Sequence, residues 1–233
     1  MTKVKKSSIL LTCLLLALLC GVLFYIDGNA SKYIIRITRL CAINIVLALS
    51  MNLVNGFTGI FSLGHAGFMA IGAYTVALLT IPVAKKETIF MLEPLVAPLN
   101  TLTLPFGAAL VIGGLLAAAL AFLIGLPCLR LRGDYLAIAT LGFSEIIRIV
   151  ITNAQSLTNG AQGLKSIPAT ANIWWCYGAA LATVVFIALL ISSSYGRAFK
   201  SIREDEIAAE SMGVSLLRHK MLSFMLSAFL AAV

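Results

Sequence analysis

The sequence predicts an all-α integral membrane protein with about six complete transmembrane helices and a seventh cut off at the C-terminus. Of its 233 residues, 61% are hydrophobic and 11% are charged, and the mean hydropathy is +1.02. A soluble domain carries roughly 25% charged residues, so this chain has too few charges to cover a water-facing surface. Apolar runs close to the length that spans a bilayer also recur along the chain. A soluble globular domain and a disordered chain are both excluded.

The first apolar run, 9–26, follows Lys3, Lys5 and Lys6 and is interpreted as an N-terminal anchor. A cleaved signal peptide is the alternative, with a weak small-residue motif at 28–30. The run of 18 residues exceeds the roughly 7–15 apolar residues of a signal peptide. This length favours a retained anchor.

Six further apolar runs are interpreted as spans, and they lie at 37–54, 66–81, 104–126, 135–151, 173–191 and 221–233. The fourth span of the chain is expected to stop at Pro127, and the segment 82–103 is expected to be a loop. The last run has 13 residues, so the chain is interpreted as truncated inside a seventh span. Residues 1–233 are treated as one transmembrane domain.

The distribution of basic residues predicts the orientation. With the N-terminus inside, the other cytoplasmic segments are 55–65, 127–134 and 192–220, and the inside holds ten Lys and Arg against six outside. Cytoplasmic loops carry such an excess. The net charge of +8 is therefore explained by basic residues in the cytoplasmic segments, and no nucleic-acid partner is expected.

Catalytic and metal-binding motifs are missing from the sequence. There is no phosphate-binding loop, no HExxH and no GxSxG; the two histidines are isolated, and the five cysteines form no CxxC pair. Membrane enzymes need clustered acids, histidines or cysteines. The sequence therefore predicts no enzyme activity, no metal site and no bound cofactor.

A glycine-rich stretch, 52–67, interrupts the apolar pattern. Irregular backbone at membrane depth requires protein or a wet cavity around it, and broken helices often form transport sites. The alternative is a plain cytoplasmic turn, and the sequence leaves both open. The residues assigned to a translocation path are Asn55, Gly56, Thr58, Gly59, Ser62, Gly64 and His65.

Glu145 and Arg148 are three residues apart on one predicted helix and are expected to pair. Either alone would cost about 2.5–3.5 kcal/mol at the centre of a span, so both are expected to face away from lipid. Thr140, Ser144 and Arg148 form a polar stripe on this helix. The pair is interpreted either as an internal structural ion pair or as part of the translocation path.

The segment 192–220 is too charged to enter lipid. Ile202, Ile207 and Met212 recur near helical spacing, which predicts one short amphipathic helix within 195–213. Gly213 is expected to end it, because glycine readily takes the left-handed conformation after a helix. The helix is interpreted as a solvated loop helix or as a docking element for a soluble partner.

Four segments carry a resemblance to a known family: NLVNGFTGIFSLGHAGFMAIGAYT (52–75), LRLRGDYLAIATLGFSEIIR (129–148), SLTNGAQGL (156–164) and GRAFKSIREDEIAAESMG (196–213). They resemble the LivM-type permease subunit of branched-chain amino-acid ABC importers. The likeness covers most of the chain after about residue 40. Members of this family are longer, which agrees with the interpretation of a truncated chain.

The resemblance implies that the segment 192–220 couples the permease to ATPase subunits through an EAA-type loop, in which Ile207 replaces the usual glutamate. The coupling residues it implies are Arg203, Glu204, Asp205, Glu206, Ala208, Ala209 and Gly213. The implied partners are a second related permease, two ATPases that bind the ATP and an extracytoplasmic binding protein. The implied location is a bacterial-type inner membrane.

The substrate implied by the resemblance is a branched-chain amino acid, and a site near 55–64 could use Phe57, Phe61 and Phe68 as its apolar wall. A permease for urea or short amides is the nearest alternative. An ion-coupled secondary carrier would need Glu145 as its coupling carboxylate, which Arg148 is expected to neutralise. A scaffold without transport activity is disfavoured by the coupling motif.

The predicted topology places position 200 in the cytoplasm and position 165 outside. In a background without other cysteines, we expect Lys165→Cys to react with a membrane-impermeant maleimide in intact cells. Lys200→Cys should react only after the membrane is opened. Labelling of Lys200→Cys from outside would contradict both the topology and the coupling role of 192–220.

Overall fold

The computed structural model describes residues 6–90, 95–96, 99–131, 133–165, 167–168 and 170–233, and within these ranges every regular element is a helix. The predicted cytoplasmic residues Lys3, Lys5 and Arg132 lie outside the described residues. Each of the seven predicted apolar runs coincides with a long helix. These helices are α1 (Lys6–Asn29), α2 (Lys32–Asn52), α3 (His65–Thr80), α5 (Phe106–Cys128), α6 (Asp134–Asn153), α8 (Ile173–Ser192) and α11 (Leu216–Ala232).

Six short helical elements connect the long ones. They are η1 (Leu53–Phe57), α4 (Val83–Ile89), α7 (Gln155–Thr158), η2 (Gly160–Gln162), α9 (Ser194–Glu204) and α10 (Glu206–Ser211). The element η1 is a π-helical turn and η2 is a 3₁₀ turn.

Four helical segments among the described residues are long and apolar enough to cross a membrane: Lys32–Phe57, Phe106–Cys128, Asp134–Asn153 and Ile173–Ser192. The apolar helices over Leu14–Asn29 and His65–Thr80 are shorter. The structure therefore confirms an all-helical chain with several membrane-length helices. The count of six complete spans and a partial seventh stays a prediction.

Two boundaries differ from the sequence prediction. Helix α5 continues through Pro127 to Cys128, and the N–H of Leu129 still donates to Gly125 O at 2.9 Å. A proline in the last turn removes one hydrogen bond without ending the helix. The predicted loop 82–103 contains α4, where buried Lys86 donates its Nζ protons to Leu99 O at 2.7 Å and Leu102 O at 2.8 Å. These contacts depend on tertiary structure and leave no local sequence pattern.

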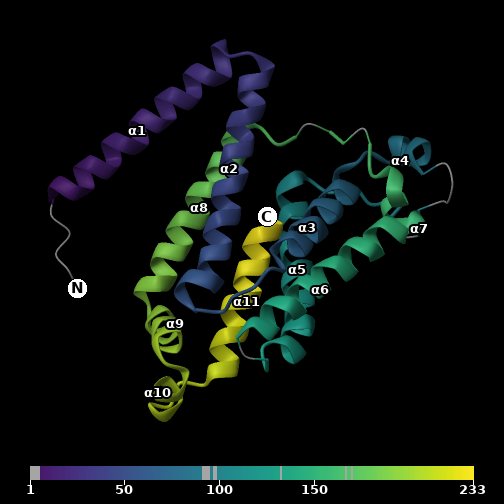
Figure 1. Cartoon of the computed structure of the whole chain (residues 1–233). Helices are drawn as coiled ribbons and strands as arrows, with labels where there is room; N and C mark the ends of the chain where they lie inside the picture. The colour runs from purple at the N-terminus through teal and green to yellow at the C-terminus, as the bar shows by residue number, and fades with distance from the viewer. Residues whose placement is uncertain (1–5, 91–94, 97–98, 132, 166, 169) are drawn as a thin grey trace.

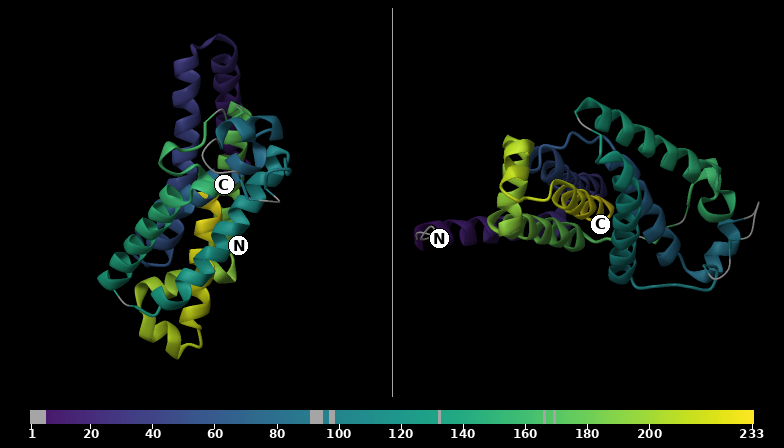
Figure 2. Two further views of the ribbon diagram at one scale, coloured as in Figure 1. Left: turned by 90° about the vertical axis from the view of Figure 1, so that its right-hand side faces the viewer. Right: turned by 90° about the horizontal axis from the view of Figure 1, so that it is seen from below.

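Helix α11 lies at the centre of the bundle, with α2 and α8 on one side and α3, α5 and α6 on the other (Figure 1). It packs most extensively against α5 and α3. In the core, the rings of Phe68 on α3 and Phe224 on α11 meet edge to face with centroids 5.5 Å apart. Helix α1 leaves the bundle and touches little besides α2 (Figure 2).

Small residues allow the closest helix contacts. A Cβ atom at Gly72 on α3 would lie 2.2 Å from the carbonyl oxygen of Ala232 on α11. Because the obstructing atoms belong to the backbone of the other helix, they cannot move aside without separating the helices. Such close approach through small residues is a usual way for membrane helices to associate.

We expect Gly72→Ala to weaken the packing of α3 on α11, since overpacking typically costs about 1–3 kcal/mol. The melting temperature of the purified protein in detergent should fall by at least about 2 °C. The control is Gly142→Ala on α6, where a Cβ meets nothing within 4 Å and helix propensity alone predicts a small gain. Equal melting temperatures for Gly72→Ala and the wild type would contradict this packing.

Candidate functional site

The helix formed by α2 breaks where the glycine-rich stretch begins. It runs into the π-turn η1 and then into the irregular segment 58–64 before α3 starts at His65. Thr58, which is buried, donates its hydroxyl proton to Leu53 O at 3.0 Å, and the N–H of Ile60 donates to Val54 O at 3.1 Å. Gly59 has a φ of +74°, which side chains resist. We call residues 53–64 the broken segment.

The polar side chains of the broken segment bind its own backbone. Asn55 Oδ1 accepts from the N–H of Ser62 at 3.2 Å, and the hydroxyl of Ser62 accepts from the N–H of Gly64 at 3.4 Å. Ser62 and Thr58 are buried. These side chains therefore supply bonds that a regular helix would make between backbone groups.

Helix α6 fixes the end of the broken segment through Thr140, which is also buried. The N–H of Leu63 donates to Thr140 Oγ1 at 3.1 Å, and the same hydroxyl donates to Ala137 O at 3.0 Å. A Cβ atom at Gly64 would lie 3.2 Å from Thr140 O. Glycine at position 64 thus allows the chain to lie directly against α6.

His65 joins the start of α3 to α11. Its Nε2 lies 2.7 Å from Ser227 Oγ, and Ser227 is buried. Its Nδ1 is buried and has no hydrogen-bond partner among the described residues. With the proton on Nδ1, the hydroxyl of Ser227 donates to Nε2. Our sequence prediction did not include Ser227, although a serine repeated at positions 223 and 227 in an apolar run was an available signal.

Helix α9 packs directly on the broken segment. Arg203 Nη1 donates to Gly56 O at 3.1 Å, and Arg203 also pairs with Glu204. A Cβ atom at Gly59 would lie 2.9 Å from Arg203 Cγ and 3.1 Å from Arg203 Cα. The absence of a side chain at Gly59 therefore lets α9 approach the backbone of the break.

The predicted single helix of 195–213 is wrong in one respect, because the structure divides it into α9 and α10 at Asp205. This residue has extended dihedral angles (φ −157°, ψ 113°) and caps α10 by accepting from the N–H groups of Ile207 at 2.8 Å and Ala208 at 3.1 Å. An aspartate in this position satisfies free N–H groups at the start of a helix. The two hydrogen bonds that Asp205 accepts favour a new helix over the continuation of α9.

The prediction that Gly213 ends the helix is confirmed. Its φ is +86°, its N–H donates to Glu210 O at 2.9 Å, and the N–H of Val214 donates to Ala209 O at 3.0 Å. This pattern of bonds is a Schellman motif. The short helix α10 is therefore capped at both ends by its own residues.

The remaining predicted coupling residues lie on opposite faces of α10. Ala209 is buried, whereas Ala208 is exposed, and so are the apolar side chains of Ile207 (74%) and Met212 (85%). Glu206 pairs with Lys220 of α11 at 2.6 Å, and Lys220 is buried. Lys220 was absent from the predicted site, and its position at the boundary between a basic stretch and an apolar run was the available signal.

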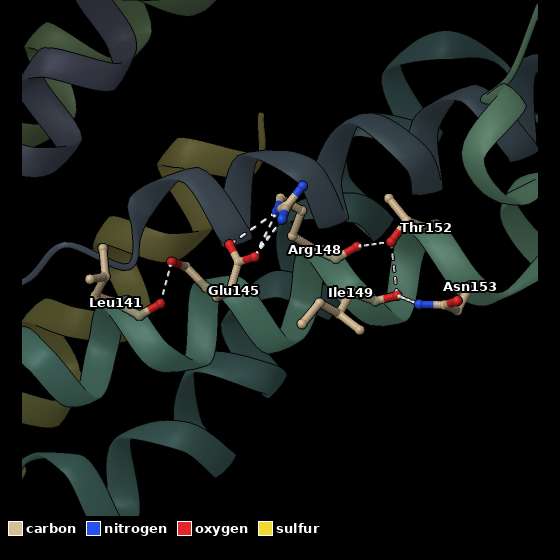
Figure 3. Close-up of polar contacts among 7 residues, drawn as sticks. Leu141, Glu145, Arg148, Ile149, Thr152 and Asn153 are labelled. Carbon is tan, nitrogen blue, oxygen red and sulfur yellow. Dashed lines mark hydrogen bonds and ion pairs between the residues drawn. The ribbon is translucent and has the colours of Figure 1, made fainter.

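Glu145 and Arg148 form the predicted ion pair on α6, with Arg148 Nη2 2.5 Å from Glu145 Oε1 (Figure 3). Their side chains are 52% and 69% exposed, so within this chain they do not face the interior as expected. The buried face of α6 is formed instead by Leu136, Ala137 and Thr140. The pair is therefore separate from the broken segment.

The three phenylalanines that were predicted to form an apolar wall do not surround one space. Phe57 lines a groove of about 420 Å³ between α2 and α8, whereas Phe68 is buried against Phe224 and Phe61 is exposed. The gap beside Gly64 and Thr140 has no room for a water molecule. An apolar cavity of about 320 Å³ lies elsewhere, between α2, α3, α5, α8 and α11. In this conformation the segment is a packed junction between helices.

Comparisons with known proteins identify a family. A family model described as the permease component of the branched-chain amino acid transport system matches residues 33–233. The chain is 37% identical over 235 residues to the high-affinity branched-chain amino acid transport system permease protein LivM of Escherichia coli K12, covering 86% of this chain and 51% of that protein. The LivM protein of Salmonella typhimurium is 36% identical with the same coverage.

A more distant relative is the probable branched-chain amino acid transport permease protein LivM of Methanocaldococcus jannaschii. It is 21% identical over 221 residues, which cover 81% of this chain and 61% of that protein. The chain thus spans about half the length of the first two relatives. No solved structure matches it.

We expect Thr140→Val to destabilise the protein by about 1 kcal/mol, because the N–H of Leu63 loses its acceptor. The melting temperature in detergent should fall by about 2–4 °C. Thr140→Ser should retain most of the stability. The matched control is Thr183→Val on α8, since the buried Thr183 hydroxyl bonds only within its own helix, to Ala179 O at 2.9 Å. Equal losses at both positions would contradict a special role for Thr140.

Proposed function

The chain belongs to the family of permease components of branched-chain amino acid transport systems, and we propose that it acts as the transmembrane permease of an ATP-driven importer of branched-chain amino acids. The observation that carries the proposal is the α9–α10 unit. It is a water-facing pair of short helices, capped by Asp205 and Gly213 and attached directly to the broken segment. A permease without a nucleotide-binding motif must receive work through contact with another subunit, and this unit offers a surface for that contact.

The docking surface for the ATPase is proposed to be the outer face of α10. Ile207 and Met212 expose large apolar side chains there, and Glu204, Ala208 and Glu210 are exposed beside them. Apolar anchors surrounded by polar groups are typical of the energetically dominant part of an interface. The other predicted coupling residues support this surface from behind, because Asp205 caps α10, Glu206 binds Lys220 and Arg203 binds Gly56.

The remaining parts of the importer are proposed from the family. They are a second related permease, two ATPases that bind the ATP and an extracytoplasmic binding protein, assembled in a bacterial-type inner membrane. The exposed ion pair of Glu145 and Arg148 on α6 supports contact with the second permease, since charges are costly in lipid. About six complete spans are proposed for this part of the protein.

The substrate is proposed to be leucine, isoleucine or valine, as in the names of the relatives. Glu145 is bound by Arg148 and is therefore a poor coupling carboxylate for an ion-driven carrier. Import of urea or short amides remains the alternative that an uptake measurement distinguishes.

The test is uptake by the complete importer, reconstituted in vesicles with the second permease, the two ATPases and the binding protein. We expect ATP-dependent uptake of leucine, isoleucine or valine. Ile207→Asp should lower ATPase binding about tenfold, which corresponds to loss of about 1.4 kcal/mol at an apolar anchor. The control Val96→Asp places the same charge at an exposed position of the predicted outer segment 82–103 and should not change ATPase binding. Transport of urea alone would overturn the substrate assignment, and normal binding by Ile207→Asp would overturn the docking surface.

A further inference from the structure

Arg203 of α9 binds the broken segment directly, and Glu206 of α10 binds Lys220 of α11, the helix that also contacts His65 just after that segment. We propose that Arg203 and Lys220 are positioning residues that fasten the α9–α10 unit to both ends of residues 53–64, so that a displacement of this unit moves the break. The inference rests on the proposed function and adds a role for these two side chains that is distinct from ATPase docking.

The first contact holds the start of the broken segment. Arg203 Nη1 donates to Gly56 O at 3.1 Å, and Gly59 lies close enough that a Cβ atom there would be 3.2 Å from Arg203 Cβ. Phe199 and Ile202 of the same helix are buried, so α9 is anchored at this place by packing as well. Arg203 therefore directs its charge toward the break, with its side chain 44% exposed.

The second contact reaches the other end through α11. Glu206 at the start of α10 binds Lys220 at 2.6 Å. Lys220 and Ser227 are seven residues apart, which is close to two helical turns, so both lie on one face of α11. Ser227 Oγ is 2.7 Å from Nε2 of His65, the residue that follows the broken segment. Helix α11 thus links α10, which it binds through Lys220, to the residue after the break, which it binds through Ser227.

A displacement of α9 and α10 is expected to move the broken segment, because the segment lacks a continuous row of helical backbone hydrogen bonds. Its backbone is held by Asn55, Thr58, Ser62 and Thr140 through single hydrogen bonds. Each such bond contributes only about 1 kcal/mol net. A regular helix would instead distribute a displacement over a continuous row of backbone bonds. Movement of α9 and α10 together is therefore expected to rearrange residues 53–64 before it deforms α2 or α3.

The experiment measures ATP hydrolysis and leucine uptake in the same vesicles, with the complete importer. We expect Arg203→Gln to lower the leucine imported per ATP hydrolysed about tenfold when it is compared with the wild type at equal ATPase binding. Arg203→Lys should recover part of the loss, since one donor to Gly56 O remains. The double variant Glu206→Gln, Lys220→Met removes both charges of the second contact and should reduce the same ratio. A purely stabilising role would not change this ratio.

The outcomes separate the two proposals. No ATP-driven leucine uptake by the wild-type importer would overturn the proposed function. Uptake with an unchanged ratio in Arg203→Gln, or loss of ATPase binding in that variant, would overturn the positioning role of Arg203 alone.

Discussion

A buried peptide group needs a hydrogen-bond partner, and this requirement governs the fold around residues 53–64. The chain leaves the helical state there because other protein groups replace the missing backbone bonds. In this protein the replacements come from the segment itself and from neighbouring helices. Asn55, Thr58 and Ser62 bind local backbone groups, while Thr140 of α6 binds the N–H of Leu63. The break is therefore also the place where the helices meet.

Helix α11 contacts most of the helices that meet at this junction. Its apolar face packs on α3 and α5 through Phe224 and the small residues near its end, while Lys220 and Ser227 provide polar contacts at two levels. Buried polar groups in such surroundings are costly when unpaired, so each contact favours one particular arrangement of the helices. The same helix thus combines tight packing with a specific orientation of its neighbours.

The charged segment after α8 contains two groups of residues with different roles. One group holds the segment against the core, and the other remains exposed. Asp205 and Gly213 define the short helix α10, and Glu206 and Arg203 fasten the segment to the core. Apolar Ile207 and Met212 are left exposed. In water-facing surroundings an exposed apolar side chain of this size is more informative about binding than the acids beside it.

The sequence by itself determined the helical class, the position of each long helix and the end of α10, because these depend on apolar run length and on the local preference of glycine for positive φ. It also identified the broken segment and the pairing of Glu145 with Arg148, which are local in the chain. Tertiary structure alone decided which distant side chains hold the break and the residue after it. Arg203, Thr140 and Ser227 are separated along the sequence by 77 to 162 residues from the residues they bind. It also decided that α4 forms and that α6 turns its ion pair outward. Contacts between residues so far apart depend on how the helices pack, and no local pattern records them.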